Sequence, residues 1–180
     1  EDYSILTSKN CQLILGSQYA LLRSEFAKWR EFSLERRSKS EFKQLLINMG
    51  GVDVDNITEE VLDELKLCNL PKDINITVVM GDLAPHLESI KSKAITLPYK
   101  IKVKVDVNNM AEIMSNTDIA IGAAGSTAWE RCCLGLPTIQ IVTAENQNTI
   151  AKYLARNNAV KPFKDVKEFP SIINNCNSWM

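Results

Sequence analysis

The segment Gly122–Thr127 has the composition of a loop that binds phosphate groups. Small residues lead to the hydroxyl side chains of Ser126 and Thr127 and then to a predicted helix. Backbone amides, hydroxyls and the positive end of a helix would converge there, which suits a diphosphate. Glu130 follows about one turn into that helix, where a carboxylate can accept hydrogen bonds from a ribose diol. The alternative is that Ser126 or Thr127 only caps the helix, supported by Glu130.

Two other segments have similar chemistry. In Gly50–Asp53, paired glycines let the backbone approach a ligand, and a following helix start would direct amides at an anion. Thr143–Gln147 offers consecutive small and polar residues that suit hydroxyl or amide recognition on a sugar. For both segments a plain turn or helix cap is the alternative. Because GxGxxG and the P-loop lysine are both lacking, neither a dinucleotide site nor an NTPase is supported.

His86 is the only histidine, so a multi-histidine metal site is excluded within this chain, and no metal or cofactor is expected. Its place at a predicted helix start favours a surface or capping role over catalysis. The five cysteines show no C-x-x-C spacing, which favours a reduced cytoplasmic protein over a disulfide scaffold.

The overall composition fits one globular domain. The chain has 180 residues, of which 45% are hydrophobic and 24% charged, and its net charge of −1 argues against nucleic-acid binding. Basic residues cluster from Arg30 to Lys43, but interleaved glutamates indicate a solvated helix face. No apolar run approaches the ~18 residues of a membrane span, and the N-terminus has no signal-peptide layout, so no membrane partner is expected.

From about residue 42, β-rich runs alternate with helical patterns. The predicted strands are 42–49, 74–80, 99–107, 119–123 and 137–142, and the predicted helices are 58–67, 85–93, 110–116, 129–134 and 148–156. Short connections between them imply parallel strands with right-handed crossovers, hence an α/β fold with a doubly wound, Rossmann-like sheet.

The first forty residues do not follow this alternation. Cys11–Leu15 is predicted as one more strand, and Leu21–Arg37 as a long amphipathic helix carrying Leu22, Phe26 and Trp29. Residues 1–8 offer neither a cap nor a strand, and residues 172–180 end on an apolar Trp179–Met180. Both ends suggest a piece of a larger protein.

Four separated motifs resemble those of PseG, the family of UDP-sugar hydrolases of pseudaminic acid biosynthesis, and of the related SpsG-type polysaccharide proteins. The motifs occur in the family's order, the resemblance covers about residues 7–160, and a more distant similarity runs to MurG. The four segments are Leu15–Arg23, Met49–Asp53, Asp118–Pro137 and Glu145–Gln147.

The resemblance implies the C-terminal half of a GT-B-like architecture, in which two Rossmann-like domains face each other across a cleft. It implies that residues 1–40 form an interdomain segment with a long helix packed on the domain. Residues 41–180 would be the nucleotide-binding domain, and the catalytic N-terminal domain would lie outside this chain.

The same resemblance implies a role for each candidate residue. Gly125, Ser126 and Thr127 would bind the diphosphate of a UDP-sugar, above Gly50 and Gly51, and Glu130 would bind the ribose. The backbone around Val107, Asn108 and Asn109 would read the uracil edge, while Glu145, Asn146 and Gln147 would face the sugar, with Asn146 nearest the reacting centre.

Two departures from the family affect these roles. The glycine-rich segment that carries the family's catalytic histidine does not occur here, and His86 does not match its context. Val52 and Val54 replace the usual Ser and Pro, and the change at position 52 removes a hydroxyl that could touch phosphate.

Three functions remain open. The first is metal-independent hydrolysis of a UDP-sugar together with the other domain, with this chain inactive alone. The second is a glycosyltransferase that uses the same donor site. The third is a non-catalytic accessory domain, for instance one fused to a cytidylyltransferase.

Overall fold

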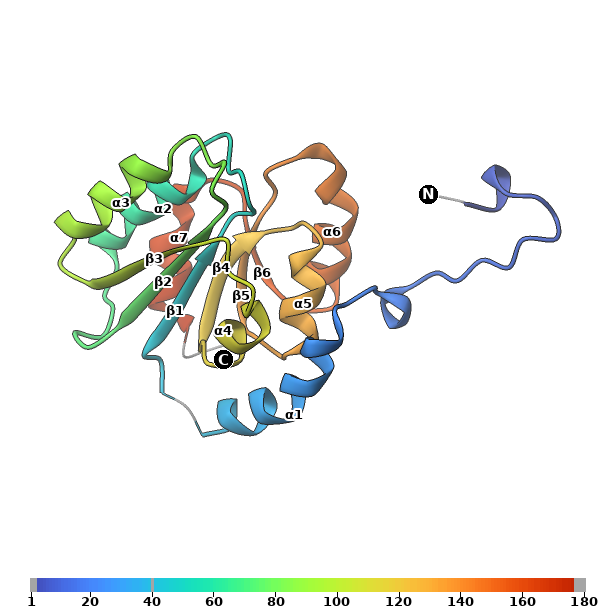
Figure 1. The fold of residues 1–180 in the computed structure, drawn as a ribbon, viewed down its shortest axis with the longest axis horizontal. Coiled ribbons are helices and arrows are strands. Elements are labelled where there is room, and N and C mark those ends of the chain that lie inside the picture. The colour runs from blue at the N-terminus through green and yellow to red at the C-terminus, as the bar shows by residue number, and fades with distance from the viewer. Residues whose placement is uncertain (1–2, 40, 177–180) are drawn as a thin grey trace.

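A six-stranded, fully parallel sheet forms the centre of the molecule, with the strand order β3-β2-β1-β4-β5-β6 (Figure 1). The computed structural model describes residues 3–39 and 41–176. The strands are β1 (Gln44–Asn48), β2 (Asn75–Met80), β3 (Lys100–Val105), β4 (Ile119–Ala123), β5 (Thr138–Ile141) and β6 (Lys161–Phe163). The helices are α1 (Ser24–Arg37), α2 (Ile57–Glu64), α3 (Leu87–Thr96), α4 (Met110–Ser115), α5 (Thr127–Cys133), α6 (Asn148–Arg156) and α7 (Phe169–Asn174). The doubly wound α/β prediction is confirmed.

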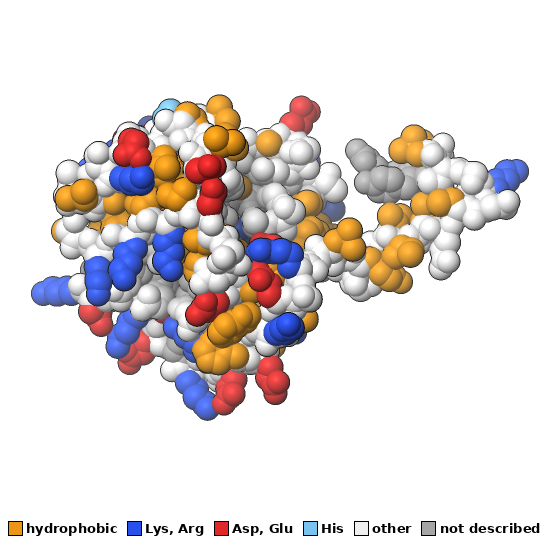
Figure 2. All heavy atoms as spheres, in the orientation of Figure 1, with side chains coloured by type: hydrophobic (Ala, Val, Ile, Leu, Met, Phe, Trp, Pro, Cys, Tyr) orange, Lys and Arg blue, Asp and Glu red, His pale blue; other side chains and the backbone are white. Residues whose placement is uncertain are grey.

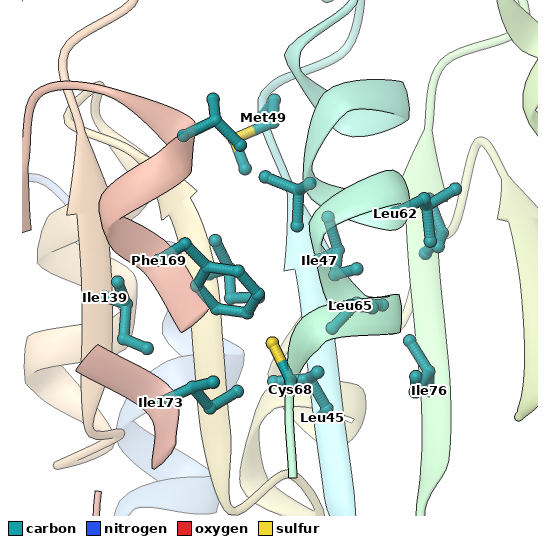
Figure 3. Close-up of a cluster of buried hydrophobic side chains, with 14 of the residues drawn as sticks. Leu45, Ile47, Met49, Leu62, Leu65, Cys68, Ile76, Ile139, Phe169 and Ile173 are labelled. Carbon is teal, nitrogen blue, oxygen red and sulfur yellow. The ribbon is translucent and has the colours of Figure 1, made fainter. Parts of the chain in front are cut away.

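Helices cover both faces of the sheet, as its strand order requires. The larger core lies between one face and helices α2, α3 and α7, where Phe169 and Ile173 of α7 approach Ile139 of β5 (Figure 3). The smaller core lies on the opposite face, beneath α1 and α4, and includes Phe26 and Leu46. Helix α6 packs beside α5. Since each central strand is buried on both faces, β1 and β4 consist almost wholly of buried residues, as is typical of parallel sheets.

Helix α1 docks on the domain largely through polar contacts. Phe26 is fully buried, but Arg37 also donates to the Met114 carbonyl at 2.7 Å, Ser33 donates to the Leu134 carbonyl at 2.7 Å, and Arg36 pairs with Asp118 at 2.7 Å. Arg37 and Ser33 thereby satisfy carbonyls at the C-terminal ends of α4 and α5. The prediction of a solvated basic face between Arg30 and Lys43 is therefore wrong for Arg36 and Arg37, which are half-buried.

Two further expectations about the chain ends need correction. Cys11–Leu15 forms no strand; the segment is extended, exposed and unpaired with the sheet. Strand β6 and helix α7 occupy a region where the sequence indicates no element, because Pro162 and Pro170 resemble breakers there. Residues 3–6 form a single 3₁₀ turn, and the apolar Trp179–Met180 lies outside the described residues.

The segment before α1 extends away from the domain as an arm (Figure 1). Its exposed hydrophobic side chains gather along its length, as Figure 2 shows, and Leu21 is 99% exposed. The arm touches α6 where the Ser17 hydroxyl lies 3.1 Å from the Tyr153 hydroxyl. Exposed apolar side chains gathered in this way are uncommon on the surface of a folded domain.

The two outer strands of the sheet differ in character. Strand β3 carries Lys100, Lys102 and Lys104 on one face, and β6 holds Pro162 at its centre. The five cysteines all lie in the described residues, and none of them forms a disulfide. Within the part of the chain that the structure describes, no helix is long and apolar enough to cross a membrane.

Candidate functional site

The candidate site lies where the order of the strands reverses, between β1 and β4. Strands β1 and β4 are neighbours, but the chain leaves β1 for α2 on one face and β4 for α5 on the other. The loops after these strands, residues 49–56 and 124–126, therefore diverge at the carboxyl ends of the strands. Doubly wound sheets bind ligands in the crevice that forms at such a point.

Gly50 and Gly51 form an open floor after β1. Gly50 has φ of 106°, a conformation that favours glycine, and a Cβ added at either residue would meet nothing within 4 Å. The loop is braced from the side by Gly81, whose N–H donates to the Gly51 carbonyl at 2.8 Å. A ligand can therefore approach the backbone here, as the paired glycines predict.

Asp53 corrects one part of the prediction for this loop. Its carboxylate accepts hydrogen bonds from the N–H groups of Ile57 and Thr58 at 3.0 and 2.9 Å, at the start of α2. The first amides of that helix are thus occupied by a side chain and do not serve an anion. Asp53 is therefore a helix-capping residue. Six residues of loop separate Gly50 from α2, so the predicted contact of this loop with an anion depends on the glycines alone.

Replacing Asp53 by alanine is expected to lower the free energy of unfolding by about 1–2 kcal/mol, the usual cost of losing a helix N-cap. Equilibrium urea unfolding measures this change. Asp55→Ala, an exposed position in the same loop, is the matched control and should change stability by less than about 0.5 kcal/mol. Equal losses in the two variants would contradict the capping role.

The loop after β4 presents unpaired donors. Ser126 precedes α5, yet its side chain forms no capping hydrogen bond and the residue is exposed. Among the described residues, the N–H groups of Gly125, Ser126 and Thr127 have no protein acceptor. The alternative in which Ser126 only caps the helix is therefore wrong. Since α5 has only seven residues, the amides and the hydroxyl, rather than a long helix dipole, are what this loop offers an anion.

Glu130 lies near the middle of α5 with its side chain 16% exposed. Its nearest cation is Arg23, at the start of α1, whose guanidinium lies 3.7 Å from the carboxylate. Burial raises the pKa of Glu130 above its ordinary value, and Arg23 and Arg131 partly oppose this shift. The carboxylate is thus poorly solvated and has free acceptor capacity for a hydroxyl-bearing ligand.

The loop after β5 lies beside the loop after β4. Gln147 is the link: its amide nitrogen lies 3.8 Å from where a Cβ on Gly125 would stand, and its amide oxygen accepts from the Thr143 N–H at 3.0 Å. Glu145 and Asn146 are exposed on the 3₁₀ turn between them. The structure therefore brings two of the predicted segments together, with Asn146 free to face a ligand.

The loop after β3 crosses the sheet toward β4. Val107 packs against the smaller core, which includes residues of β1 and β4, while Asn108 and Asn109 remain exposed. At the start of α4, the Asn109 amide donates to the Glu112 carboxylate at 2.7 Å, and no side chain caps the backbone. Packing of Val107 therefore directs this loop over the centre of the sheet.

His86 makes a structural contact with the loop after β1. Its Nε2 lies 3.1 Å from the Val54 carbonyl, at the start of α3, which fits the structural role that the sequence favours. Within the described ranges, no group of three or more His, Cys, Asp or Glu residues could hold a metal ion.

Sequence reasoning passed over a buried polar row beneath the site. Asn48, Gly122 and Gln140 are register neighbours on β1, β4 and β5, and the side chain of Arg131 lies against Gly122. The available signal was an arginine directly after Glu130 in a segment otherwise made of small and apolar residues.

A parallel sheet of this strand order, with helices on both faces, has the architecture of the C-terminal domain of a GT-B protein. The chain belongs to the glycosyltransferase family 28 C-terminal domain family, whose characteristic pattern matches residues 16–173.

Similar proteins include enzymes and polysaccharide proteins. The chain is 30% identical to the spore coat polysaccharide biosynthesis protein SpsG of Bacillus subtilis, covering 81% of this chain and 42% of that protein. It is also 30% identical to the UDP-2,4-diacetamido-2,4,6-trideoxy-beta-L-altropyranose hydrolase of Campylobacter jejuni, covering 86% and 53%. The MurG crystal structure of Acinetobacter baumannii matches with a TM-score of 0.64 at 22% identity, covering 81% and 43%. The chain thus spans about half, or less, of the length of these relatives.

Proposed function

We propose that this domain binds the UDP part of a nucleotide sugar at the carboxyl ends of β1, β4 and β5. The observation that carries the proposal is the set of free donors after β4, which follow the strand next to β1 and its open Gly50–Gly51 turn. Three backbone amides and the Ser126 hydroxyl suit the oxygens of a diphosphate. No other chemistry is available in the loop, because its side chains are otherwise apolar or occupied.

The remaining contacts follow from the neighbouring loops. Glu130 accepts hydrogen bonds from the ribose hydroxyls, and the backbone of residues 107–109, crossing above the sheet, reads the edge of the uracil. Asn146 and Gln147 face the sugar. These assignments place the nucleotide across the crevice and the sugar at its open side, toward a second domain.

We further propose that the complete protein is a hydrolase, which releases UDP from a diacetamido-trideoxy hexose with a histidine of the second domain activating water. Similarity to the Campylobacter hydrolase supports this choice. The donors at Ser126 would stabilise the negative charge that develops on the departing diphosphate. Membership of a glycosyltransferase family favours a second candidate, transfer of the sugar to another acceptor. A product assay separates them, since hydrolysis yields the free sugar and transfer yields a glycoside.

Calorimetric titration of the 180-residue chain with UDP, CMP and the free sugar tests the binding site. We expect weak UDP binding, at least tenfold weaker binding of CMP, and no measurable release of UDP from the nucleotide sugar. Lys91→Met, at a half-buried position of α3 where the lysine pairs with Glu88, is a charge-changing control that should leave UDP binding unchanged. Equal binding of CMP, or rapid turnover by this chain alone, would contradict the proposal.

A further inference from the structure

Arg131 is a buried cation directly beneath the loop after β4. Its side chain is 1% exposed; Nη2 donates to the Ala123 carbonyl at 2.6 Å and Nη1 donates to the Thr127 hydroxyl at 3.2 Å. Ala123 is the last residue of β4, and Thr127 is the first residue of α5. The two hydrogen bonds from Arg131 therefore link the two ends of the loop 124–126 on its buried side. The guanidinium therefore fixes both ends of the loop that offers its amides to the ligand.

The sheet makes room for this cation at Gly122. A Cβ on Gly122 would lie 2.6 Å from Nη1 and 2.9 Å from Cζ of Arg131, so the guanidinium occupies the space that a side chain at position 122 would need. Asn48 and Gln140 flank Gly122 in register, are buried, and carry side-chain oxygens without a hydrogen-bond partner. The buried polar side chains beside Gly122, against which Arg131 lies, are therefore neutral amides.

The charge of Arg131 has no direct counterpart in the protein. Among residues 3–39 and 41–176, no carboxylate forms an ion pair with it, and Glu130 acts on it only at longer range. Its Nε is buried without a partner. Burial lowers the pKa of Arg131 to about 10, so the side chain remains charged at neutral pH. A charge buried without a counter-ion destabilises a folded protein.

We propose that Arg131 is the buried countercharge for the diphosphate and the positioning residue of its loop. This inference rests on the proposed function, because it requires an anion on the outer side of residues 124–126. The bound diphosphate supplies the negative charge that the interior lacks. The short loop separates the two, and their attraction is strong because little water lies between them. Arg131 thus favours charged over uncharged ligands without touching them.

A purely structural role makes a different prediction. An apolar side chain of similar length would fill the same space without a buried charge, and replacing buried ionic groups in this way is often neutral or stabilising. If Arg131 served only the fold, Arg131→Met would damage the binding of every ligand equally. If it serves the diphosphate, the damage is confined to phosphorylated ligands.

The test measures dissociation constants for UDP and for uridine, together with the unfolding temperature without ligand. For Arg131→Met we expect an unfolding temperature at least equal to that of the native chain. We expect at least tenfold weaker UDP binding and less than twofold change for uridine. Arg131→Lys keeps the charge but cannot make both loop bonds, and should therefore lose less UDP affinity than Arg131→Met without matching the native chain.

Each outcome supports or overturns the proposal. Unchanged UDP binding by Arg131→Met, or equal losses for UDP and uridine, overturns the role of Arg131 while leaving the UDP site intact. Failure of the native chain to bind UDP overturns the proposed function itself, and this inference with it.

A measurement on the native chain covers the case in which Arg131→Met does not fold. Buried charges are screened little by salt, whereas exposed lysines are screened strongly. The preference of the native chain for UDP over uridine should therefore persist at 1 M sodium chloride, a concentration at which the Debye length is about 3 Å. Collapse of this preference would assign it to surface charges and overturn the proposal.

Discussion

Replacing Glu130 by glutamine is expected to weaken UDP binding by about tenfold to a hundredfold. Hydrogen bonds from hydroxyls to an ionised carboxylate contribute about 1.5–3 kcal/mol each, and about 1.4 kcal/mol corresponds to a factor of ten. The same substitution should raise the free energy of unfolding, because the half-buried carboxylate has only a distant partner in Arg23. Calorimetric titration and urea unfolding measure the two effects. Glu60→Gln, at an exposed position of α2, is the matched control.

The pH dependence of the two effects has opposite signs. Because the folded-state pKa of Glu130 is raised, its ionised form costs stability above the ordinary value of 4.5, and this cost disappears as pH falls through the raised pKa. UDP binding needs the ionised form, so affinity should decline over the same range. The terminal phosphate of UDP also titrates, at about pH 6. The pH profile of UDP binding to Glu130→Gln measures this contribution and serves as the baseline. Parallel profiles for the native chain and the variant would contradict the role of Glu130.

Replacing Asp118 by alanine is expected to lower the free energy of unfolding by about 3–5 kcal/mol, the usual cost of removing one member of a buried ion pair. Asp118 is 3% exposed and binds three groups. Its Oδ2 accepts from the N–H groups of Lys43 and Gln44 at 2.9 and 2.7 Å, and its Oδ1 pairs with Arg36 at 2.7 Å. One carboxylate therefore joins α1, the start of β1 and the start of β4.

A mutant cycle separates the contributions of these contacts. Asp118→Asn retains an acceptor for the backbone and should cost about half as much as Asp118→Ala, and combining it with Arg36→Met measures the ion pair alone. Asp55→Asn serves as the exposed control. Because Asp118 precedes β4, at the end of the sheet away from the crevice, folded Asp118→Ala should bind UDP as the native chain does. A stability loss below about 1 kcal/mol, or a loss of UDP affinity in the folded variant, would contradict this account.

The sequence predicts the interior of this fold better than its margins. Apolar runs indicate β1, β2, β4 and β5 because these strands are largely buried, and the alternation of apolar residues with lysines indicates the edge strand β3. The helices between them follow from amphipathic spacing. Strand β6 has three residues, two of them exposed, so it carries no periodic signal. Cys11–Leu15 shows the reverse error. Its apolar residues indicate a strand, but the segment is exposed and pairs with no strand of the sheet.

The sequence likewise predicts only part of the candidate site. Composition alone indicates the loops at Gly50 and at Ser126 as candidates, because glycines and hydroxyls lie there at predicted strand ends. The capping role of Asp53 and the closure of the loop by Arg131 depend on distances that spacing does not reveal. An arginine among small residues is a visible irregularity, but its sequence does not state whether it points outward or into the sheet.

The outer strands of the sheet bear on how copies of this domain behave when crowded. An unpaired strand edge invites a neighbouring chain to add a strand and to begin a fibril. On β3, the alternate lysines at 100, 102 and 104 would face the same lysines of an identical strand, and like charges would repel. On β6, Pro162 has no N–H to donate to a further strand. Chain-to-chain growth of the sheet is therefore discouraged at both ends, and concentrated solutions of the folded domain should resist amyloid formation.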